Sequence, residues 1–303
     1  ATTDIYTLTQ HDALPIYQFC KFAQNRFTMK SSRSNSLLNT SLRTSGFIFL
    51  LGFIFYAPHV VKGQEKAFQW NGHSCAVVLT YDDGLNVHLD KVIPALDAAR
   101  LKGTFYAEGR APSLHLRMDE WRRAAASGHE LGNHTLFHPC AGSPAGRSFV
   151  SADFDLDTYT VRRITEELRV ANTLLKAIDG KEKRTFAYTC GDRKAGDTDF
   201  IPQVKSLFPG ARGVASKMET PESIDLYNVG AYMINGQTGE QMIALVKEAQ
   251  QKGRLLVFLF HGVGGEHNLD VSLEAHNQLV EYLKENRKDI WVGTMLDVVE
   301  FLK

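Results

Sequence analysis

Two adjacent carboxylates and a pair of histidines are the side chains of this sequence whose type and spacing could do chemistry. Asp82 and Asp83 follow the apolar run AVVLTY, and His134 and His138 lie four residues apart in NHTLFHP. In a single helical turn before Pro139, that spacing would place both imidazole rings on one side of the backbone. Two such imidazoles are a common half of a zinc site, and a carboxylate is a normal third ligand of catalytic zinc. We therefore expect a divalent metal site with one aspartate as its third ligand.

The adjacency of Asp82 and Asp83 has a physical meaning in such a site. Consecutive residues of an extended segment project to opposite faces, so one carboxylate can bind metal while its neighbour faces the water. A cation close to both would also offset the repulsion between two neighbouring negative charges. The structural alternative is a helix cap or a turn with the sequence DDG, and the histidine pair argues against it.

The segments that must position these residues alternate between strand-like and helix-like patterns from residue 75 onward. Their apolar runs are too continuous for a half-exposed sheet, which predicts a parallel sheet covered by helices. Seven or eight such units in about 230 residues favour a distorted (β/α) barrel with about seven parallel strands; an open sheet is the alternative. The predicted strands are 75–81, 103–109, 129–134, 184–189, 212–216, 226–234, 254–260 and 290–295, and the predicted helices are 87–101, 118–127, 157–178, 239–252, 272–287 and a short one at the C-terminus.

Three polar clusters directly follow predicted strands, where the active sites of βα folds are built. They are the aspartate pair, the segment 133–139 and the segment HGVGG at 261–265. One polar residue at such a place is more often a cap, whereas three clusters together indicate one site at the carboxyl ends of the strands. His261 joins the candidate site on this ground.

The N-terminal part of the chain predicts export. The apolar segment FIFLLGFIFYA at 47–57 follows several basic residues, as in a secretory signal peptide, and it is shorter than the roughly 20 residues of a membrane span. We expect a signal peptide over 29–63, with an uncleaved anchor as the alternative, and a mature domain over 64–303 without a stable membrane span. The protein would then be periplasmic or extracellular. Residues 1–28, which include TLTQHDALPI, are interpreted as a non-native translated leader.

The charge balance excludes one class of partner. Lys plus Arg and Asp plus Glu number 34 each, so the formal net charge is zero at pH 7. A nucleic-acid-binding protein uses a basic excess to neutralise phosphates, so we expect no nucleic-acid partner.

The motifs TYDDG, GHELGNHTLFHP and FLFHG together resemble those of the polysaccharide deacetylases, the NodB homology group also called carbohydrate esterase family four. The resemblance spans roughly residues 75–300. It implies a metal-dependent hydrolase that removes N- or O-linked acetyl groups from an oligosaccharide or polysaccharide. Zn²⁺ is the usual metal of this family, and Co²⁺, Ni²⁺ or Mn²⁺ are alternatives.

The resemblance also implies roles for five side chains: metal ligands Asp83, His134 and His138, general base Asp82 and general acid His261. The metal would lower the pKa of a bound water from about 15.7 to near 7 and polarise the acetyl carbonyl. Asp82 would take the proton of that water, while the metal and the backbone N–H of Cys190 would stabilise the oxyanion. His261, with an ordinary pKa of about 6.5, would protonate the leaving sugar nitrogen or oxygen.

Two motifs depart from the family pattern. The third normally carries an arginine that holds the base aspartate, but the corresponding AYTCG at 187–191 has neither that arginine nor the usual proline. Arg184 and Arg193 are the nearest candidates to replace it. The fourth motif, an acidic pair that supports the acid histidine, is not visible, and Asp225 is the only acidic residue close to the predicted strand 226–234.

The positions of the motifs imply further contacts at the same rim. Cys140 follows the histidine motif and Cys190 lies in the third motif, so we expect them to approach and to pair in an oxidising compartment; two separate buried thiols are the alternative. Tyr188 in the third motif, and Glu266 and His267 after HGVGG, are expected substrate contacts.

Two rival functions come from other classes. A non-catalytic carbohydrate-binding relative would retain the fold and the metal site but would have lost activity through the altered third motif. A glycosidase would use the two aspartates as its catalytic pair, but it needs carboxyl groups about 5 to 9.5 Å apart across one bond, which adjacent residues do not naturally provide.

Overall fold

The structure is a computed structural model that describes residues 68–303. The expected leader at 1–28 and the expected signal peptide at 29–63 lie outside the described residues. Within residues 68–303, none of the helices has both the length and the apolar character needed to cross a bilayer.

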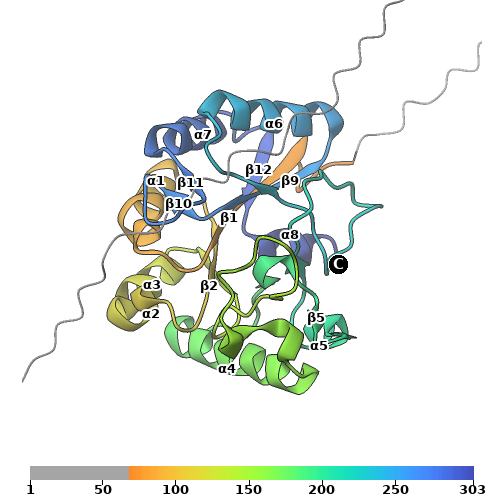
Figure 1. Ribbon diagram of the computed structural model, residues 1–303. Coiled ribbons are helices and arrows are strands. Elements are labelled where there is room, and N and C mark those ends of the chain that lie inside the picture. Colours follow the sequence, from red (N-terminus) through yellow and green to blue (C-terminus); the bar gives the residue numbers. More distant parts are fainter. Residues whose placement is uncertain (1–67) are drawn as a thin grey trace, which may run out of the picture. The chain divides into compact units, whose positions relative to one another are not determined.

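Parallel strands form the centre of the described domain (Figure 1). The strands of the main sheet are β1 (Cys75–Asp82), β2 (Thr104–Ala107), β3 (Glu130–Asn133), β4 (Phe186–Ala187), β7 (Ala211–Arg212), β8 (Tyr232–Met233), β9 (Leu255–Phe260) and β12 (Ile290–Gly293). Seven of them follow the order β7-β4-β3-β2-β1-β9-β8, and β12 pairs with β1 beside this path. Every pairing in this sheet is parallel, which confirms the predicted distorted (β/α) barrel.

The two edge strands of this path, β7 and β8, are linked by a short bridge rather than by a regular strand pair. The Val229 N–H donates to the Ala211 carbonyl at 3.0 Å, and the Gly213 N–H donates to the Val229 carbonyl at 2.8 Å. The Ala231 N–H donates to the Ala215 carbonyl at 2.9 Å, immediately before β8 begins. These bonds close the curved sheet, so the carboxyl ends of β1 and β7 face a common interior.

The pairing partner of β1, the most central strand, changes along its length. Its first half, from Cys75 to Val78, pairs with β12, whereas its second half, from Thr80 to Asp82, pairs with β2. All eight residues of β1 are buried, as its continuous apolar run predicts. Because side chains alternate along a strand, Asp82 points to the same side as Thr80 and Val78, toward the barrel interior.

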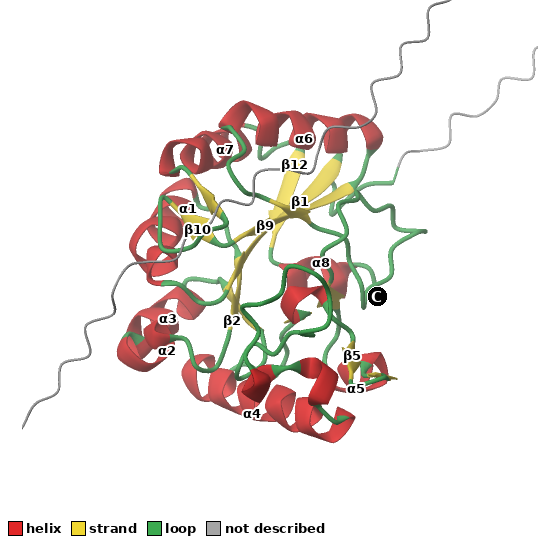
Figure 2. Ribbon diagram, in the orientation of Figure 1, coloured by secondary structure: helices red, strands yellow, loops and turns green. Residues whose placement is uncertain are grey.

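Helices surround the strands (Figure 2). They are α1 (Ile93–Ala99), α2 (Pro112–Leu116), α3 (Met118–Ala126), α4 (Val161–Asp179), α5 (Ile201–Leu207), α6 (Gly239–Lys252), α7 (Leu273–Glu285) and α8 (Met295–Phe301). The predicted helix at 87–101 begins as a π-helical turn, His88–Val92, before α1. Helices α2 and α5 were not predicted, because five to seven residues are too few to show a helical period.

The ends of the longer helices follow local sequence signals. The Thr160 hydroxyl accepts from the Arg163 N–H at the start of α4, and Gly180 ends that helix with a left-handed backbone. At α6 the side chains of Thr238 and Gln241 form a capping box, and Gly253 ends the helix.

Candidate metal centre and active-site cavity

Three potential metal ligands from two strand ends converge in the structure. Asp83 Oδ1 lies 3.6 Å from His134 Nε2 and 3.4 Å from His138 Nε2. All three ligand atoms fit within 4.8 Å of one another, which one coordination sphere can span. Asp83 Oδ1 is also buried without a hydrogen-bond partner among the described residues, as expected of an oxygen that is free to bind a cation. The donor set of two imidazoles and one carboxylate therefore fits a divalent metal.

The electrostatics of this ligand set favour a cation as well. Burial and the neighbouring Asp82 raise the pKa of Asp83 to about 7, because two buried negative charges are costly without a counter-charge. Burial lowers the pKa of His134 to about 3, so its ring is uncharged at neutral pH. Its Nδ1–H donates to the Ala187 carbonyl at 2.9 Å, which leaves the Nε2 lone pair facing the ligand set.

The two histidines reach the site by a different backbone path from the predicted one. The segment between them is not a helical turn: Thr135 (φ 66°) and His138 (φ 51°) both adopt left-handed conformations. A β-branched residue such as Thr135 rarely does so. Here the Thr135 N–H donates to Asn133 Oδ1 and the His138 N–H donates to the Thr135 hydroxyl. These bonds stabilise the bend and bring the imidazole ring centroids within 4.9 Å.

Asp82 forms a buried ion pair with Arg212 of β7. Arg212 Nη2 donates to both carboxylate oxygens, at 2.5 Å for Oδ1. Burial alone would raise the pKa of Asp82, but the Arg212 guanidinium outweighs it and lowers the pKa to about 2. Asp82 is thus a carboxylate at neutral pH, and Arg212 fixes its orientation.

The arginines expected to hold Asp82 were the wrong ones. Arg184 is buried and pairs with Asp179 at 3.0 Å, so it has no role at this carboxylate. Arg193 lines a separate surface hollow. Arg212 was not among the predicted site residues although it stands first in the predicted strand 212–216. A charged residue at the edge of such an apolar strand needs a buried partner, and that was the available signal.

His261 follows β9. A hydrogen bond to its backbone carbonyl and a stacking contact with its ring hold it in place. His88 Nε2–H donates to the His261 carbonyl at 2.8 Å. The His261 ring stacks on His267, with centroids 4.7 Å apart and planes inclined by 12°. Its Nδ1 is buried without a hydrogen-bond partner among the described residues, and burial lowers the pKa of the ring to about 4. Asp225 does not supply the missing partner, because its Oδ1 accepts from the Tyr227 N–H.

His267 faces the metal ligands, whereas its neighbour Glu266 turns away. His267 Nδ1 accepts from the Leu269 N–H at 3.0 Å, so its Nε2 carries the proton and lies 3.8 Å from Asp83 Oδ2. Both carboxylate oxygens of Glu266 accept hydrogen bonds from residues 86 and 87, at 2.8 and 2.7 Å. The Glu266 carboxylate is thus occupied by hydrogen bonds within the protein, and its contact with substrate stays a prediction.

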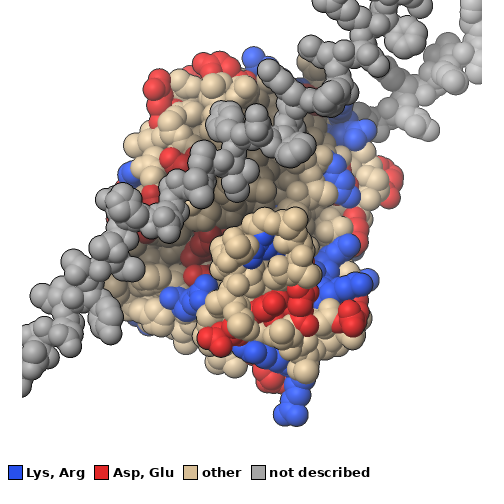
Figure 3. All heavy atoms as spheres, viewed as in Figure 1, with Lys and Arg blue, Asp and Glu red and all other residues tan. Residues whose placement is uncertain are grey.

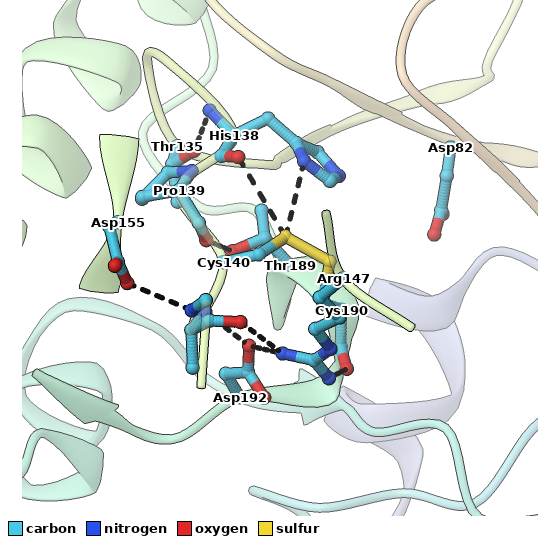
Figure 4. The surroundings of a disulfide bond; sticks show 12 residues. Asp82, Thr135, His138, Pro139, Cys140, Arg147, Asp155, Thr189, Cys190 and Asp192 are labelled. Atoms are coloured by element: carbon cyan, nitrogen blue, oxygen red, sulfur yellow. Dashed lines mark hydrogen bonds and ion pairs between the residues drawn. A yellow bond between two sulfur atoms is a disulfide. The ribbon is translucent and has the colours of Figure 1, made fainter. Parts of the chain in front are cut away.

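A disulfide joins the two loops beside the metal ligands (Figure 4). Cys140 and Cys190 are bonded, and Cys140 Sγ lies 3.6 Å from His138 Nδ1. Arg147 braces the same loops, because its guanidinium contacts the Asp192 carboxylate and donates to the Cys190 carbonyl at 3.2 Å. The rim next to His138 is thereby held in one arrangement.

These groups surround one cavity of about 220 Å³, called here the metal-centre cavity. Its lining comprises Asp82, Asp83, His134, His138, Phe149, Tyr188, Cys190, Arg212, Val214, Met233, Leu259, His261, His267 and Leu269. The cavity contains every side chain that the resemblance implied for metal binding and acid–base chemistry. Tyr188 and Cys190 lie in its wall, and the Tyr188 hydroxyl donates to the Tyr227 carbonyl at 3.1 Å.

The face shown in Figure 3 carries both signs of charge in an interspersed pattern. No continuous basic stretch is visible on the described part of that face, in keeping with 34 basic and 34 acidic residues in the whole chain.

Comparisons with known proteins identify the family. Residues 71–205 match the family model described as Polysaccharide deacetylase. The chain is 23% identical over 181 residues to the uncharacterized protein YlxY of Bacillus subtilis (strain 168), which covers 56% of this chain and 51% of that protein. It is 39% identical over 64 residues to a chitooligosaccharide deacetylase of Rhizobium leguminosarum bv. trifolii, or 21% of this chain and 29% of that protein. The chain thus spans about half or less of the length of these curated relatives.

A solved structure shows the same fold. The crystal structure of a candidate polysaccharide deacetylase from Mycobacterium smegmatis superimposes with a TM-score of 0.54 at 14% identity, over 78% of this chain and 93% of that chain. The family match confirms the resemblance to the polysaccharide deacetylases, and the solved structure shows that the fold is shared.

Proposed function

On the premise that this chain carries a polysaccharide deacetylase domain, we propose that it is a metal-dependent hydrolase that removes N- or O-linked acetyl groups from a carbohydrate. The observation that carries the proposal is the meeting of three metal-type ligands, an ionised Asp82 and His261 in one cavity. Such a set supplies the parts of metal-assisted acyl hydrolysis. A divalent cation, Zn²⁺ by preference, would be held by Asp83, His134 and His138 and would polarise the acetyl carbonyl.

The roles of the remaining residues follow from their surroundings. Asp82 is ionised and held by Arg212, so it can accept the proton of the attacking water without first losing its own. His261, which lies in another part of the cavity wall, would donate a proton to the leaving nitrogen or oxygen. Because burial lowers its pKa to about 4, the ring is uncharged at neutral pH. It would therefore first take up a proton, such as the one that Asp82 accepts from the attacking water, and would then pass it to the leaving group. The backbone N–H of Cys190 would stabilise the oxyanion.

The substrate is proposed to be a periplasmic or extracellular glycan. This follows from the signal-like segment at 29–63 of the sequence and from the disulfide, which requires an oxidising compartment. The relative named chitooligosaccharide deacetylase supports N-acetylated sugars as the first substrates to test.

The test is acetate release from N-acetylglucosamine oligomers, acetylated xylan and peptidoglycan with Zn²⁺ supplied. EDTA should abolish release, and Asp82→Asn should lower kcat by about 10²- to 10⁴-fold with the metal still bound. Asp179→Asn is a matched control, because Asp179 is an equally buried partner of an arginine outside the cavity. Acetate release that persists in EDTA would refute metal dependence. The glycosidase hypothesis would instead be favoured by new reducing ends without acetate release, in the presence of EDTA.

The altered motifs favour one alternative, a carbohydrate-binding relative that retains the fold and the metal site without activity. His261 Nδ1 has no partner among the described residues, so its acid function lacks the support that a carboxylate would give. A wild-type protein that binds metal and oligosaccharide but releases no acetate from any of the three substrates would establish this alternative.

A further inference from the structure

The His138 ring stands between two groups of potential metal ligands. Its Nε2 lies 3.4 Å from Asp83 Oδ1, in the metal centre described above. Its other ring nitrogen, Nδ1, lies 3.6 Å from Cys140 Sγ, which is bonded to Cys190 Sγ (Figure 4). The two sulfurs and the ring form a second group whose ligand atoms all lie within 4.8 Å of one another. Because a thiolate and not a disulfide sulfur binds metal, this second group can act only after reduction.

The spacing of the second group fits a metal with thiolate ligands. Zinc binds a thiolate at about 2.3 Å and an imidazole nitrogen at about 2.0–2.1 Å, so two such ligands of a tetrahedral site lie roughly 3.6 Å apart. The separation of Cys140 Sγ and His138 Nδ1 is 3.6 Å. Two thiolates on one zinc lie roughly 3.8 Å apart. Side-chain rotation of Cys140 and Cys190 can provide that separation, because their Cα atoms are 5.8 Å apart.

Both cysteine backbones are held by hydrogen bonds that do not depend on the disulfide. The Cys140 N–H donates to the Phe154 carbonyl at 3.2 Å, and the Cys140 carbonyl accepts from the Leu156 N–H at 2.9 Å. Arg147 Nη2 donates to the Cys190 carbonyl at 3.2 Å. The two thiols would therefore stay close together after reduction, so they lose little freedom when they bind a cation.

Reduction requires that a reductant reaches one sulfur. Cys190 is partly exposed and lines the metal-centre cavity, whereas Cys140 is 2% exposed. A dithiol would attack Cys190 Sγ from the cavity, form a mixed disulfide and release the Cys140 thiol. Its second thiol then releases Cys190, so the dithiol becomes a disulfide while the protein gains two electrons and two protons. A divalent cation that binds both sulfurs displaces these two protons.

The two ligand groups cannot use His138 at the same time. A neutral imidazole carries a lone pair on one nitrogen and a proton on the other. The metal centre needs the lone pair on Nε2, which faces Asp83, whereas the cysteines need it on Nδ1. Metal binding by the cysteines would therefore remove one of the three ligands of the metal centre.

From these contacts we propose that reduction of the Cys140–Cys190 disulfide opens a second metal site, formed by both sulfurs and His138 Nδ1, which competes with the metal centre for one ion. Soft thiolate ligands suit Zn²⁺ and its spectroscopic substitute Co²⁺. The thiolate site exists whether or not the protein is a deacetylase, but its effect on turnover rests on the proposed function. The oxidised protein is then the active form, and a dithiol switches it off.

The experiment adds one equivalent of Co²⁺ to the oxidised protein and to the dithiol-reduced protein, after the dithiol has been removed without air. Thiolate-bound Co²⁺ gives a strong near-ultraviolet charge-transfer band that nitrogen and oxygen ligands do not give. We expect this band in the reduced wild type, and in neither the oxidised protein nor a variant with Cys140→Ser and Cys190→Ser. Reduced Asp83→Ala should keep the band, because the thiolate site does not use this carboxylate. Cys75→Ala is the matched control and should also keep it, since Cys75 is a buried thiol at the other end of β1.

Acetate release by the same samples measures the competition. If the thiolate site binds Co²⁺ ten times more tightly than the metal centre, reduction should slow release about tenfold, which corresponds to about 1.4 kcal/mol. A reduced wild type without the band, or without the circular dichroism of the oxidised protein, overturns the thiolate site. The band together with unchanged acetate release overturns the competition. If neither form releases acetate, the proposed function fails, and the band still decides whether the thiolate site exists.

Discussion

Replacing Arg212 by methionine tests whether this arginine has taken over the orientation of the catalytic carboxylate. Methionine fills much of the space of the arginine stem but carries no charge and no donor. Asp82 would then remain buried in the barrel interior without its counter-charge. We expect both a less stable protein and a slower enzyme.

The magnitude follows from the burial of the pair. Asp82 is 3% exposed and Arg212 is 0% exposed, and removing one partner of such a pair typically costs about 3–5 kcal/mol. The pKa of Asp82 gives an independent figure, because its fall from 3.8 to about 2 corresponds to about 2.4 kcal/mol of stabilisation. That stabilisation is present above pH 3.8 and is lost as the pH falls toward 2. In Arg212→Met burial instead raises the pKa of Asp82, so the stability deficit of the variant grows as the pH rises from 3.8.

Two measurements check the prediction. Urea denaturation of the metal-free proteins between pH 4 and pH 7 gives the stability difference, which should widen with pH. Acetate release by the Zn²⁺-loaded proteins should fall about 100-fold in kcat, as expected when a general base loses its position. Arg184→Met is the matched control: Arg184 is also buried and paired, with Asp179, but lies outside the cavity. It should lose comparable stability while the turnover of the folded fraction is unchanged.

The result that would refute this reasoning is an Arg212→Met protein with wild-type turnover. An Arg184→Met protein that loses activity to the same degree would also count against it, because the effect would then reflect general loosening of the barrel rather than the orientation of Asp82.

Three further predictions concern other parts of the domain. Replacing both Cys140 and Cys190 by serine should lower the free energy of unfolding by about 3–4 kcal/mol, because the bond spans a sequence separation of 50 residues; a urea midpoint of the wild type that does not respond to reductant would contradict this. Burial lowers the pKa of His129 to about 4, so only the unfolded chain gains this proton just below the ordinary value of 6.5. His129 should therefore contribute up to about 3 kcal/mol to the fall in the free energy of unfolding between pH 6.5 and pH 4, so the fall should be smaller by that amount in His129→Gln than in the wild type; parallel curves would disprove it. His267→Phe keeps an aromatic ring but removes the N–H near Asp83, so Zn²⁺ affinity should fall about tenfold in a chelator competition, and an unchanged affinity would exclude this role.

Much of the candidate site could be predicted from the sequence because its signals are local. A metal ligand must be an imidazole, a carboxylate or a thiolate, so HxxxH and DDG are visible without coordinates. The alternating strand and helix patterns showed that both motifs follow apolar strands. Because parallel strands bring their carboxyl ends to one side of the sheet, the motifs were expected to lie close together. The same apolar runs predicted the barrel, since strands buried on both faces need helices around them.

The orientation of the Asp82 carboxylate was decided by tertiary structure. Arg212 and Asp82 are 130 residues apart, and their strands β7 and β1 are separated by β4, β3 and β2 in the sheet order. Only the curvature of the closed barrel brings the two side chains together across its interior. The sequence distance from the third motif pointed instead to Arg184 and Arg193. Arg184 lies beside Asp179, at a position that depends on the end of α4.

Tertiary structure also decided which loop residues face the cavity. Glu266 and His267 are neighbours on one loop and were equal candidates, yet Glu266 has a left-handed backbone (φ 72°) and its carboxylate accepts bonds from the start of another segment. His267 is turned toward Asp83 by one hydrogen bond from Leu269. The types of residue present are a property of the sequence, whereas the direction of each side chain depends on backbone angles and partners that only the folded chain supplies.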